Sequence, residues 1–125
     1  MAITYEANSE VTTKEIIDVF LSVGWNKNPD DILDAFKNSY YITAREEGKL
    51  IGFARAITDG YYYLNIYDVV VRPECQKRGI GKAMMDQLTT HFRGMYMFLT
   101  STEGNEAFYQ RCGFIPNKTA LWIPK

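Results

Sequence analysis

The sequence predicts a single α+β domain, residues 1–125, in which helices cover a mixed, mainly antiparallel sheet. The chain of 125 residues is long enough for one hydrophobic core and too short for two. Segments that alternate like β-strands are interspersed with segments whose apolar residues recur at helical spacing. Between residues 64 and 100 a strand, a helix and another strand follow one another, which predicts a parallel crossover.

The N-terminal quarter is expected to form a strand and a helix. Residues 2–7 alternate weakly between polar and apolar side chains, which indicates a strand. Thr12 and Glu15 have the spacing of a capping box ahead of an apolar stripe. The stripe predicts a helix that ends near Gly24.

The next segments predict a second helix and a three-stranded meander. Asn28 can cap a helix and Pro29 suits its first turn. The β-rich segments 40–46 and 50–58 are separated by a short turn, which predicts a hairpin. Residues 61–71 follow another turn and form the longest strand candidate.

The C-terminal half should complete the crossover and add further strands. Ile80, Met84 and Leu88 form one helical row. The remaining elements are expected as a strand over residues 95–101, a short helix within residues 103–112, and closing strands over residues 113–116 and 119–125.

Composition and charge exclude several classes of function. The net charge of −1 provides no general attraction for nucleic acid, so no such partner is expected. No apolar run approaches the roughly 20 residues of a membrane span, and no signal peptide is visible, so no membrane association is expected. Cys75 and Cys112 show no metal-ligand spacing, so no metal is expected. One pair of cysteines is poor evidence for a disulfide framework, which favours a reducing cytoplasmic location.

The strongest functional signal is a glycine-bearing turn between a strand and a helix, "QKRGIGK" at residues 76–82. The first amides of a helix lack intrahelical partners, and the helix dipole attracts anions. Glycine also lets a phosphate approach the backbone closely. The amides of residues 77–82, together with Lys77, Arg78 and Lys82, are therefore candidates for binding a phosphate or pyrophosphate. A simple tight turn into a helix would need the same glycines, and the glycines alone do not separate these readings.

Two common phosphate-binding motifs do not match this turn. A Walker A loop requires a glycine at the position of Gln76 and a serine or threonine at the position of Ala83. The dinucleotide-binding fingerprint requires a third glycine at the position of Met84. A phosphate site at this turn would therefore belong to another class.

The surrounding sequence resembles the GCN5-related N-acetyltransferase (GNAT) family. Residues 76–81 match its Q/R-x-x-G-x-G/A signature, after a strand and at the start of a helix. Residues 105–114, "NEAFYQRCGF", resemble a second signature near the C-terminus of that family. The stretches "SVGW", "IYDVVV" and "LWIPK" resemble a bacterial and plastid subgroup that includes plant serotonin acetyltransferase-like enzymes. The resemblance implies the GNAT fold, a mixed sheet with helices on both faces.

The resemblance also implies acetyl-CoA as co-substrate. Its pyrophosphate would lie on the amides of residues 77–82, and its pantetheine arm would pair with the backbone of the strand at residues 69–71. The cofactor-binding residues expected on this basis are Val69, Val70, Val71, Gln76, Lys77, Arg78, Gly79, Ile80, Gly81, Lys82, Asn105 and Tyr109.

Two residues are expected to carry the chemistry. Tyr109 matches the family tyrosine beside the thioester sulfur and would act as general acid; the alternative is an aromatic packing residue. Asp68 is the first candidate for the base that the amine needs, because it lies in the strand next to the residues expected to bind the pantetheine arm. Aspartate is disfavoured within strands, so a compensating interaction is expected there. The alternative, given equal weight, is that Asp68 bonds a backbone amide or an arginine. His91 is expected to interact with carbonyls at a helix end.

The acceptor is less well determined. Acidic and aromatic residues around the first two helices and the strand ends would suit an amine on an apolar body, although they equally describe a capped helix and a half-buried strand. These residues are Trp25, Asp30, Asp31, Tyr40 and the tyrosines at 61–63. We expect a small-molecule primary amine. The alternatives are a protein lysine or N-terminus, and a non-catalytic acyl-CoA sensor. A homodimer is possible by family analogy.

Overall fold

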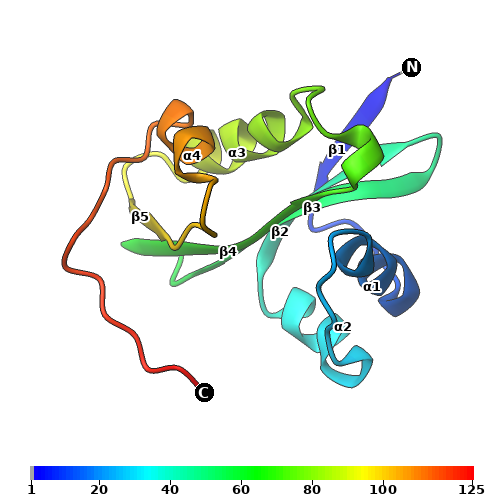
Figure 1. Cartoon of the computed structure of the whole chain (residues 1–125), viewed down its shortest axis with the longest axis horizontal. Helices are drawn as coiled ribbons and strands as arrows, with labels where there is room; N and C mark the ends of the chain where they lie inside the picture. The colour runs from blue at the N-terminus through cyan, green and yellow to red at the C-terminus, as the bar shows by residue number, and fades with distance from the viewer. Residues whose placement is uncertain (1) are drawn as a thin grey trace.

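The computed structural model describes residues 2–125 and shows a sheet with helices on both faces (Figure 1). The elements, in chain order, are β1 (Ile3–Ala7), α1 (Thr13–Ser22), α2 (Pro29–Lys37), β2 (Tyr40–Glu46), β3 (Lys49–Thr58), β4 (Tyr63–Val71), a 3₁₀ turn η1 (Pro73–Cys75), α3 (Ile80–His91), β5 (Tyr96–Leu99) and α4 (Glu106–Arg111). The predicted order is confirmed from β1 through α4.

The five strands lie side by side in the order in which they occur in the chain. The pairs β1–β2, β2–β3 and β3–β4 are antiparallel, whereas β4 and β5 are parallel. The helix α3 connects the two parallel strands, as the crossover predicted between residues 64 and 100 requires. The mixed, mainly antiparallel sheet with helices on both faces is therefore confirmed.

A β-bulge in β4 changes which residues face each side of the sheet. Arg55 of β3 pairs with Asp68, whereas the next residue of β3 pairs with Ile66, so Tyr67 is the extra residue of β4. Such an insertion reverses the alternation of side chains along a strand. Before the bulge, Ile66 faces α3; after it, Val69 packs against that same cluster, and Asp68 is turned to the α1–α2 face.

The core consists of two apolar layers, one on each face of the sheet. One layer packs α3 against the sheet and includes Ile42, Ile66 and Met84. The other packs α1 and α2 against the opposite face and is built around Phe20 and Phe53, whose rings meet edge to face. The sheet thus separates a compartment beneath α3 and α4 from one beneath α1 and α2 (Figure 1).

The start signals of the first two helices are formed as predicted. The Thr12 side chain accepts a hydrogen bond from the Glu15 amide at 3.2 Å, and the Glu15 carboxylate accepts one from the Thr12 amide at 3.0 Å. Asn28 accepts from the Asp30 amide at 3.0 Å ahead of Pro29. These caps satisfy amides that have no partner within the helix.

The closing strands expected over residues 113–116 and 119–125 are wrong. In the described chain these residues form no strand, and β5 is the last strand at its edge of the sheet. Leu121, Trp122 and Ile123 are 83–95% exposed. Strand propensity measures how well a side chain packs on a pleated surface, so an alternating apolar segment without a packing partner does not become a strand.

Candidate functional site

The site is built around the part of β4 that has a neighbour on one side only. Within residues 2–125, β5 pairs with β4 from Tyr63 to Ile66 and no further. The segment from Tyr67 to Val71 continues alongside β3 but has no strand on its other side. An unpaired strand edge presents backbone donors and acceptors to any extended ligand. The predicted pantetheine-binding residues Val69, Val70 and Val71 lie within this free edge.

The predicted phosphate loop connects the end of this edge to α3. After η1, both Lys77 and Gly79 adopt positive φ angles, 64° and 78°. A left-handed conformation is strained for residues with a side chain and easy for glycine. Gly79 is the N-cap of α3, which begins at Ile80. The loop therefore delivers the amide-rich end of α3 beside the free edge of β4.

Two of the three loop cations are held by carboxylates. Arg78 forms a two-point ion pair with Glu46 of β2, at 2.6 and 3.2 Å. This guanidinium holds the pKa of Glu46 below its ordinary value. Lys82 bonds both carboxylate oxygens of Asp86, one turn later on α3, at 2.8 and 3.1 Å. Lys77 alone of the three has no ion pair within residues 2–125.

The side chains of Gln76 and Phe108 tie the loop to its surroundings. The Gln76 amide donates to the Val71 carbonyl at 3.0 Å, which fixes the exit of β4. A Cβ at Gly81 would lie 3.2 Å from the Phe108 ring and 3.9 Å from Val71. The packing of α4 on α3 therefore leaves little room for a side chain at position 81, whatever binds at the loop.

Tyr109 lies on α4, half-buried against the cluster beneath α3. Its ring packs edge to face on Phe108 and Phe114. Burial raises the pKa of the Tyr109 phenol, and the Cys112 thiol and the Asp68 carboxylate raise it further. Tyr109 thus lies within electrostatic range of Asp68, although 41 positions separate the two residues in the sequence. The phenol remains protonated at neutral pH and can donate a proton.

Asn105 lies at the exposed N-terminal end of α4. Its carbonyl accepts from the amides of Phe108 and Tyr109, at 3.1 and 3.4 Å. Its side-chain amide donates to the Thr102 hydroxyl at 2.6 Å. Asn105 thus holds the turn that carries Tyr109 onto the site.

Asp68 forms a buried ion pair with Arg55 of β3. Arg55 Nε donates to Asp68 Oδ2 at 2.6 Å, and the two side chains are 16% and 8% exposed. Arg55 Nη1 donates to the Ser39 hydroxyl at 2.9 Å, and that hydroxyl donates to the Ala35 carbonyl at 2.6 Å. The arginine partner is the alternative weighed for Asp68 in the sequence. These hydrogen bonds connect the Asp68 carboxylate, through Arg55 and Ser39, to the C-terminal end of α2 and so fix its position.

A pocket of about 210 Å³ opens beside this ion pair on the α1–α2 face. It is lined by Phe20, Lys27, Asn28, Asp31, Ile32, Ala35, Arg55 and Asp68. Of the acceptor residues predicted from the sequence, Asp31 alone contributes to this lining. Trp25 stacks behind Phe20, with ring centroids 5.9 Å apart.

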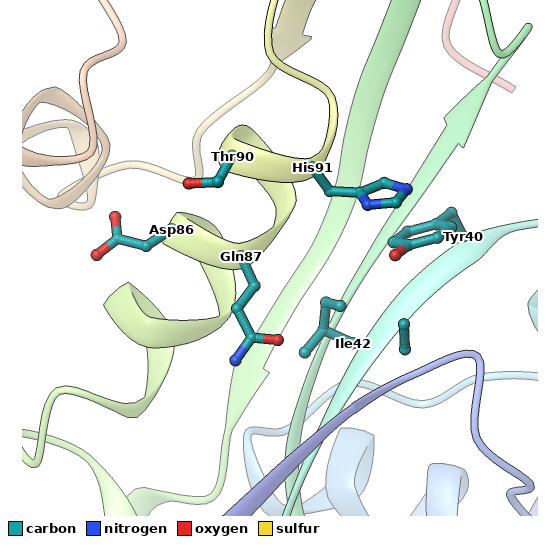
Figure 2. A pocket seen from close by; sticks show the side chains of 7 residues that line it. Tyr40, Ile42, Asp86, Gln87, Thr90 and His91 are labelled. Atoms are coloured by element: carbon teal, nitrogen blue, oxygen red, sulfur yellow. The ribbon is translucent and has the colours of Figure 1, made fainter.

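The other predicted acceptor residues lie elsewhere. Tyr40 lines a shallow groove of about 460 Å³ between α3 and the β1–β2 edge of the sheet, with Ala7, Ile42, Asp86, Gln87, Thr90 and His91 (Figure 2). In Figure 2 the His91 ring lies beside Tyr40, and the two rings are stacked with centroids 5.0 Å apart. His91 is thus an aromatic partner at the end of α3. The tyrosines at 61–63 are exposed at the opposite end of β4 from Val71.

Sequence reasoning missed Arg55 and the bulge at Tyr67. A signal for Arg55 was available, because Arg55 and Asp68 are lone charges within the apolar stretches of β3 and β4. Buried charges are stable only when paired, so each implied a partner. Nothing comparable marks Tyr67, since no glycine accompanies the bulge.

The described residues 2–125 contain neither a membrane span nor a metal cluster. No helix among them is both long and apolar enough to cross a bilayer. No three of their His, Cys, Asp or Glu side chains gather closely enough to hold a metal ion.

Comparison with solved structures identifies the architecture. The chain superimposes on a GNAT-family acetyltransferase from Streptococcus pneumoniae with a TM-score of 0.84 and 25% identity, over 99% of each chain. The five-stranded mixed sheet with four helices is therefore the GNAT fold.

Sequence comparison gives the same family. The chain is 32% identical to an uncharacterized N-acetyltransferase, ycf52, of Pyropia yezoensis, over 95% of this chain and 76% of that protein. It is 30% identical to the chloroplastic serotonin N-acetyltransferase 2 of Oryza sativa subsp. japonica, over 83% of this chain and 56% of that protein. The model of the acetyltransferase (GNAT) family matches residues 11–114, which include the free edge of β4, the phosphate loop and Tyr109. The chain is thus an acetyltransferase that belongs to the GNAT family.

Proposed function

We propose that this acetyltransferase transfers an acetyl group from acetyl-CoA directly to the primary amine of a small molecule. The observation that carries the proposal is the free edge of β4, which contains Asp68 and leads at its end into the loop at residues 76–82, with α4 and Tyr109 packed beside the start of α3. Enzymes of this family bind CoA and an acceptor, so the acceptor class is what the proposal adds.

The residues present fit acetyl-CoA. A Cβ at Gly79 would meet no atom within 4 Å, so the backbone at the start of α3 is open to an approaching phosphate. The amides of residues 77–82 and the cation Lys77 would hold the pyrophosphate. Arg78 would join them by leaving Glu46. The free edge from Tyr67 to Val71 would take the extended arm as an added strand.

The chemistry requires one proton to leave the amine and one to reach the sulfur. Bound acetyl-CoA supplies the acetyl group as a thioester, whose C–S bond breaks as the C–N bond forms. Tyr109, protonated at neutral pH, would donate its phenolic proton to the departing thiolate. Asp68, fixed by Arg55, would act as the base that accepts the proton leaving the nitrogen.

The size of the pocket supports a small acceptor. Pockets for drug-sized ligands have volumes of roughly 300–1,000 Å³, whereas the pocket beside Asp68 measures about 210 Å³. Its location on the α1–α2 face also separates the acceptor from the phosphate loop, which lies at the start of α3.

Release of CoA thiol from acetyl-CoA tests this function. We expect turnover with at least one small primary amine, and slower turnover with lysine-containing peptides of the same concentration. Calorimetric binding of CoA without thiol release for any acceptor would identify a non-catalytic sensor. Faster turnover of peptides would move the acceptor class to protein lysines or N-termini.

The loop assignment predicts that Gly79→Ala weakens CoA binding about tenfold or more. The added methyl group would project into the open space where the phosphate is expected, and a loss of about 1.4 kcal/mol corresponds to tenfold in affinity. Calorimetric titration with CoA measures the change. Gly81→Val is a poorer test, because it would displace Phe108 and disturb α4 as well.

Gly94→Ala is the matched control for the conformational strain. Gly94 also has a positive φ, 94°, and open space at its Cβ, but it lies beyond the opposite end of α3. Both variants should lose about 1 kcal/mol of stability from the strained conformation, and the control should keep its affinity. Equal affinities for the two variants would remove the phosphate from this loop.

A further inference from the structure

The ion pair at the floor of the acceptor pocket is bonded at one point only. An arginine and a carboxylate can form two parallel hydrogen bonds. Arg55 Nε bonds Asp68 Oδ2, and Arg55 Nη1 is directed to Ser39. Within residues 2–125, no protein hydrogen bond reaches Arg55 Nη2 or Asp68 Oδ1. A donor and an acceptor therefore remain available on two oppositely charged groups that are in contact through their Nε and Oδ2 atoms, 2.6 Å apart.

Both of these atoms are accessible. Among the described residues, no side-chain nitrogen or oxygen is fully buried without a hydrogen-bond partner. Arg55 Nη2 and Asp68 Oδ1 therefore retain contact with solvent, and both residues line the pocket of about 210 Å³. The pocket floor thus offers one positive and one negative contact to a ligand, from groups that the protein itself holds rigidly.

The rim of the pocket repeats this pairing of charges. Lys27 and Asp31 line it, and neither forms an ion pair within residues 2–125. The Lys27 ammonium lies 5.2 Å from the ring centroid of Phe20 and 5.7 Å from that of Trp25. These aromatic contacts hold a positive charge over the pocket mouth without neutralising it.

The pocket therefore carries two cations and two carboxylates around one small cavity. A plain amine on an apolar body would leave Lys27 and Arg55 facing uncharged surface. A purely anionic ligand would face Asp31 and Asp68. A ligand with one charge of each sign satisfies both sets. The contact between the Arg55 guanidinium and the Asp68 carboxylate, 2.6 Å from Nε to Oδ2, requires the two charges of that ligand to be close together.

We propose that the acceptor is a small zwitterion with the amine and the carboxylate attached to one carbon, as in an α-amino acid. Asp68 Oδ1 receives the amine, and Arg55 Nη2 together with Lys27 binds the carboxylate. The proposal rests on the function proposed above and names the substrate class of that site. Lys27 becomes a specificity-determining residue, because it contacts the group that distinguishes this acceptor from a simple amine.

The test compares acceptors that differ only in the charge of the carboxyl group. Thiol release is measured for L-alanine and L-serine against L-alaninamide and L-serinamide, with wild type, Lys27→Met and Lys37→Met. The selectivity is the ratio of kcat/KM for the acid to that for its amide. Dividing the selectivity of a variant by that of wild type cancels the intrinsic reactivity of each amine.

We expect wild type to acetylate the acids, and Lys27→Met to lose about tenfold in selectivity, the effect of one hydrogen bond to a charged group. Lys37→Met, an exposed lysine of α2 outside the pocket, should keep the wild-type selectivity. If the enzyme turns over the amides and Lys27→Met keeps the wild-type selectivity, the zwitterion proposal is wrong and the proposed function stands. Absence of thiol release with every amine overturns the proposed function as well.

Discussion

Tyr109→Phe is expected to lower kcat about 100-fold, the low end for loss of a general acid. The ring remains in place against Phe108 and Phe114, so only the hydroxyl is lost. Affinity for CoA should change little, because the loop and the edge of β4 are untouched. A thiolate is already a fair leaving group, and some activity should therefore survive. Single-turnover kinetics with acetyl-CoA, which isolate the chemical step, provide the measurement.

Tyr96→Phe is the control for this experiment. Tyr96 is exposed on β5 and stacks on Tyr63, outside the site. Its hydroxyl should contribute nothing to the chemical step. A Tyr109→Phe enzyme that turns over like Tyr96→Phe would leave Tyr109 as a packing residue.

Breaking the Arg55–Asp68 pair should have the second large effect. Either Asp68→Leu or Arg55→Met leaves one charge buried without its partner, which we expect to lower the free energy of unfolding by about 3 kcal/mol. The double variant replaces both charges by apolar groups and should lose less than either single variant. Thermal and urea unfolding of the four proteins completes the double-mutant cycle.

The exposed pair Lys14–Asp18 calibrates this result. Its side chains are 85% and 42% exposed, and exposed pairs contribute at most about 1 kcal/mol. Asp18→Leu should therefore change stability by less than about 1 kcal/mol. If Asp68→Leu lost no more stability than Asp18→Leu, the buried pair would have no structural role. Arg55 would then not be the residue that orients Asp68.

The elements that the sequence predicted correctly are those specified by local chemistry. The capping box of Thr12 and Glu15 and the cap at Asn28 involve residues two or three positions apart, so their geometry follows from the helix itself. The crossover follows equally directly, because two strand patterns flank one helical row. The glycine turn was also located correctly, and its positive φ at Gly79 is the conformation that favours glycine.

The features that the sequence did not predict depend on contacts between distant segments. Glu46 holds Arg78 across 32 positions, so the loop is less cationic than its composition suggests. Phe108 packs close to position 81 and leaves little room for a side chain there, which no local pattern indicates. The closing strands fail for the same reason, since residues 119–125 have strand chemistry but are exposed and pair with no strand in the structure.

The single extra residue Tyr67 means that the number of residues in β4, and not only their chemical type, decides which side chains face each side of the sheet. In a strand of strict alternation, every position shares its face with the positions two away, so Asp68 would stand with Ile66 against α3. The bulge instead lets one strand supply apolar residues to α3 along its whole length and one carboxylate to the opposite side. Deleting Tyr67 would restore regular alternation, with Ile66 still toward α3 and Asp68 still on the opposite side. A one-residue insertion or deletion between Asp68 and Val71 would instead exchange the faces of the residues that follow it. We therefore expect homologous chains to vary in side chains along residues 68–71 far more readily than in residue count.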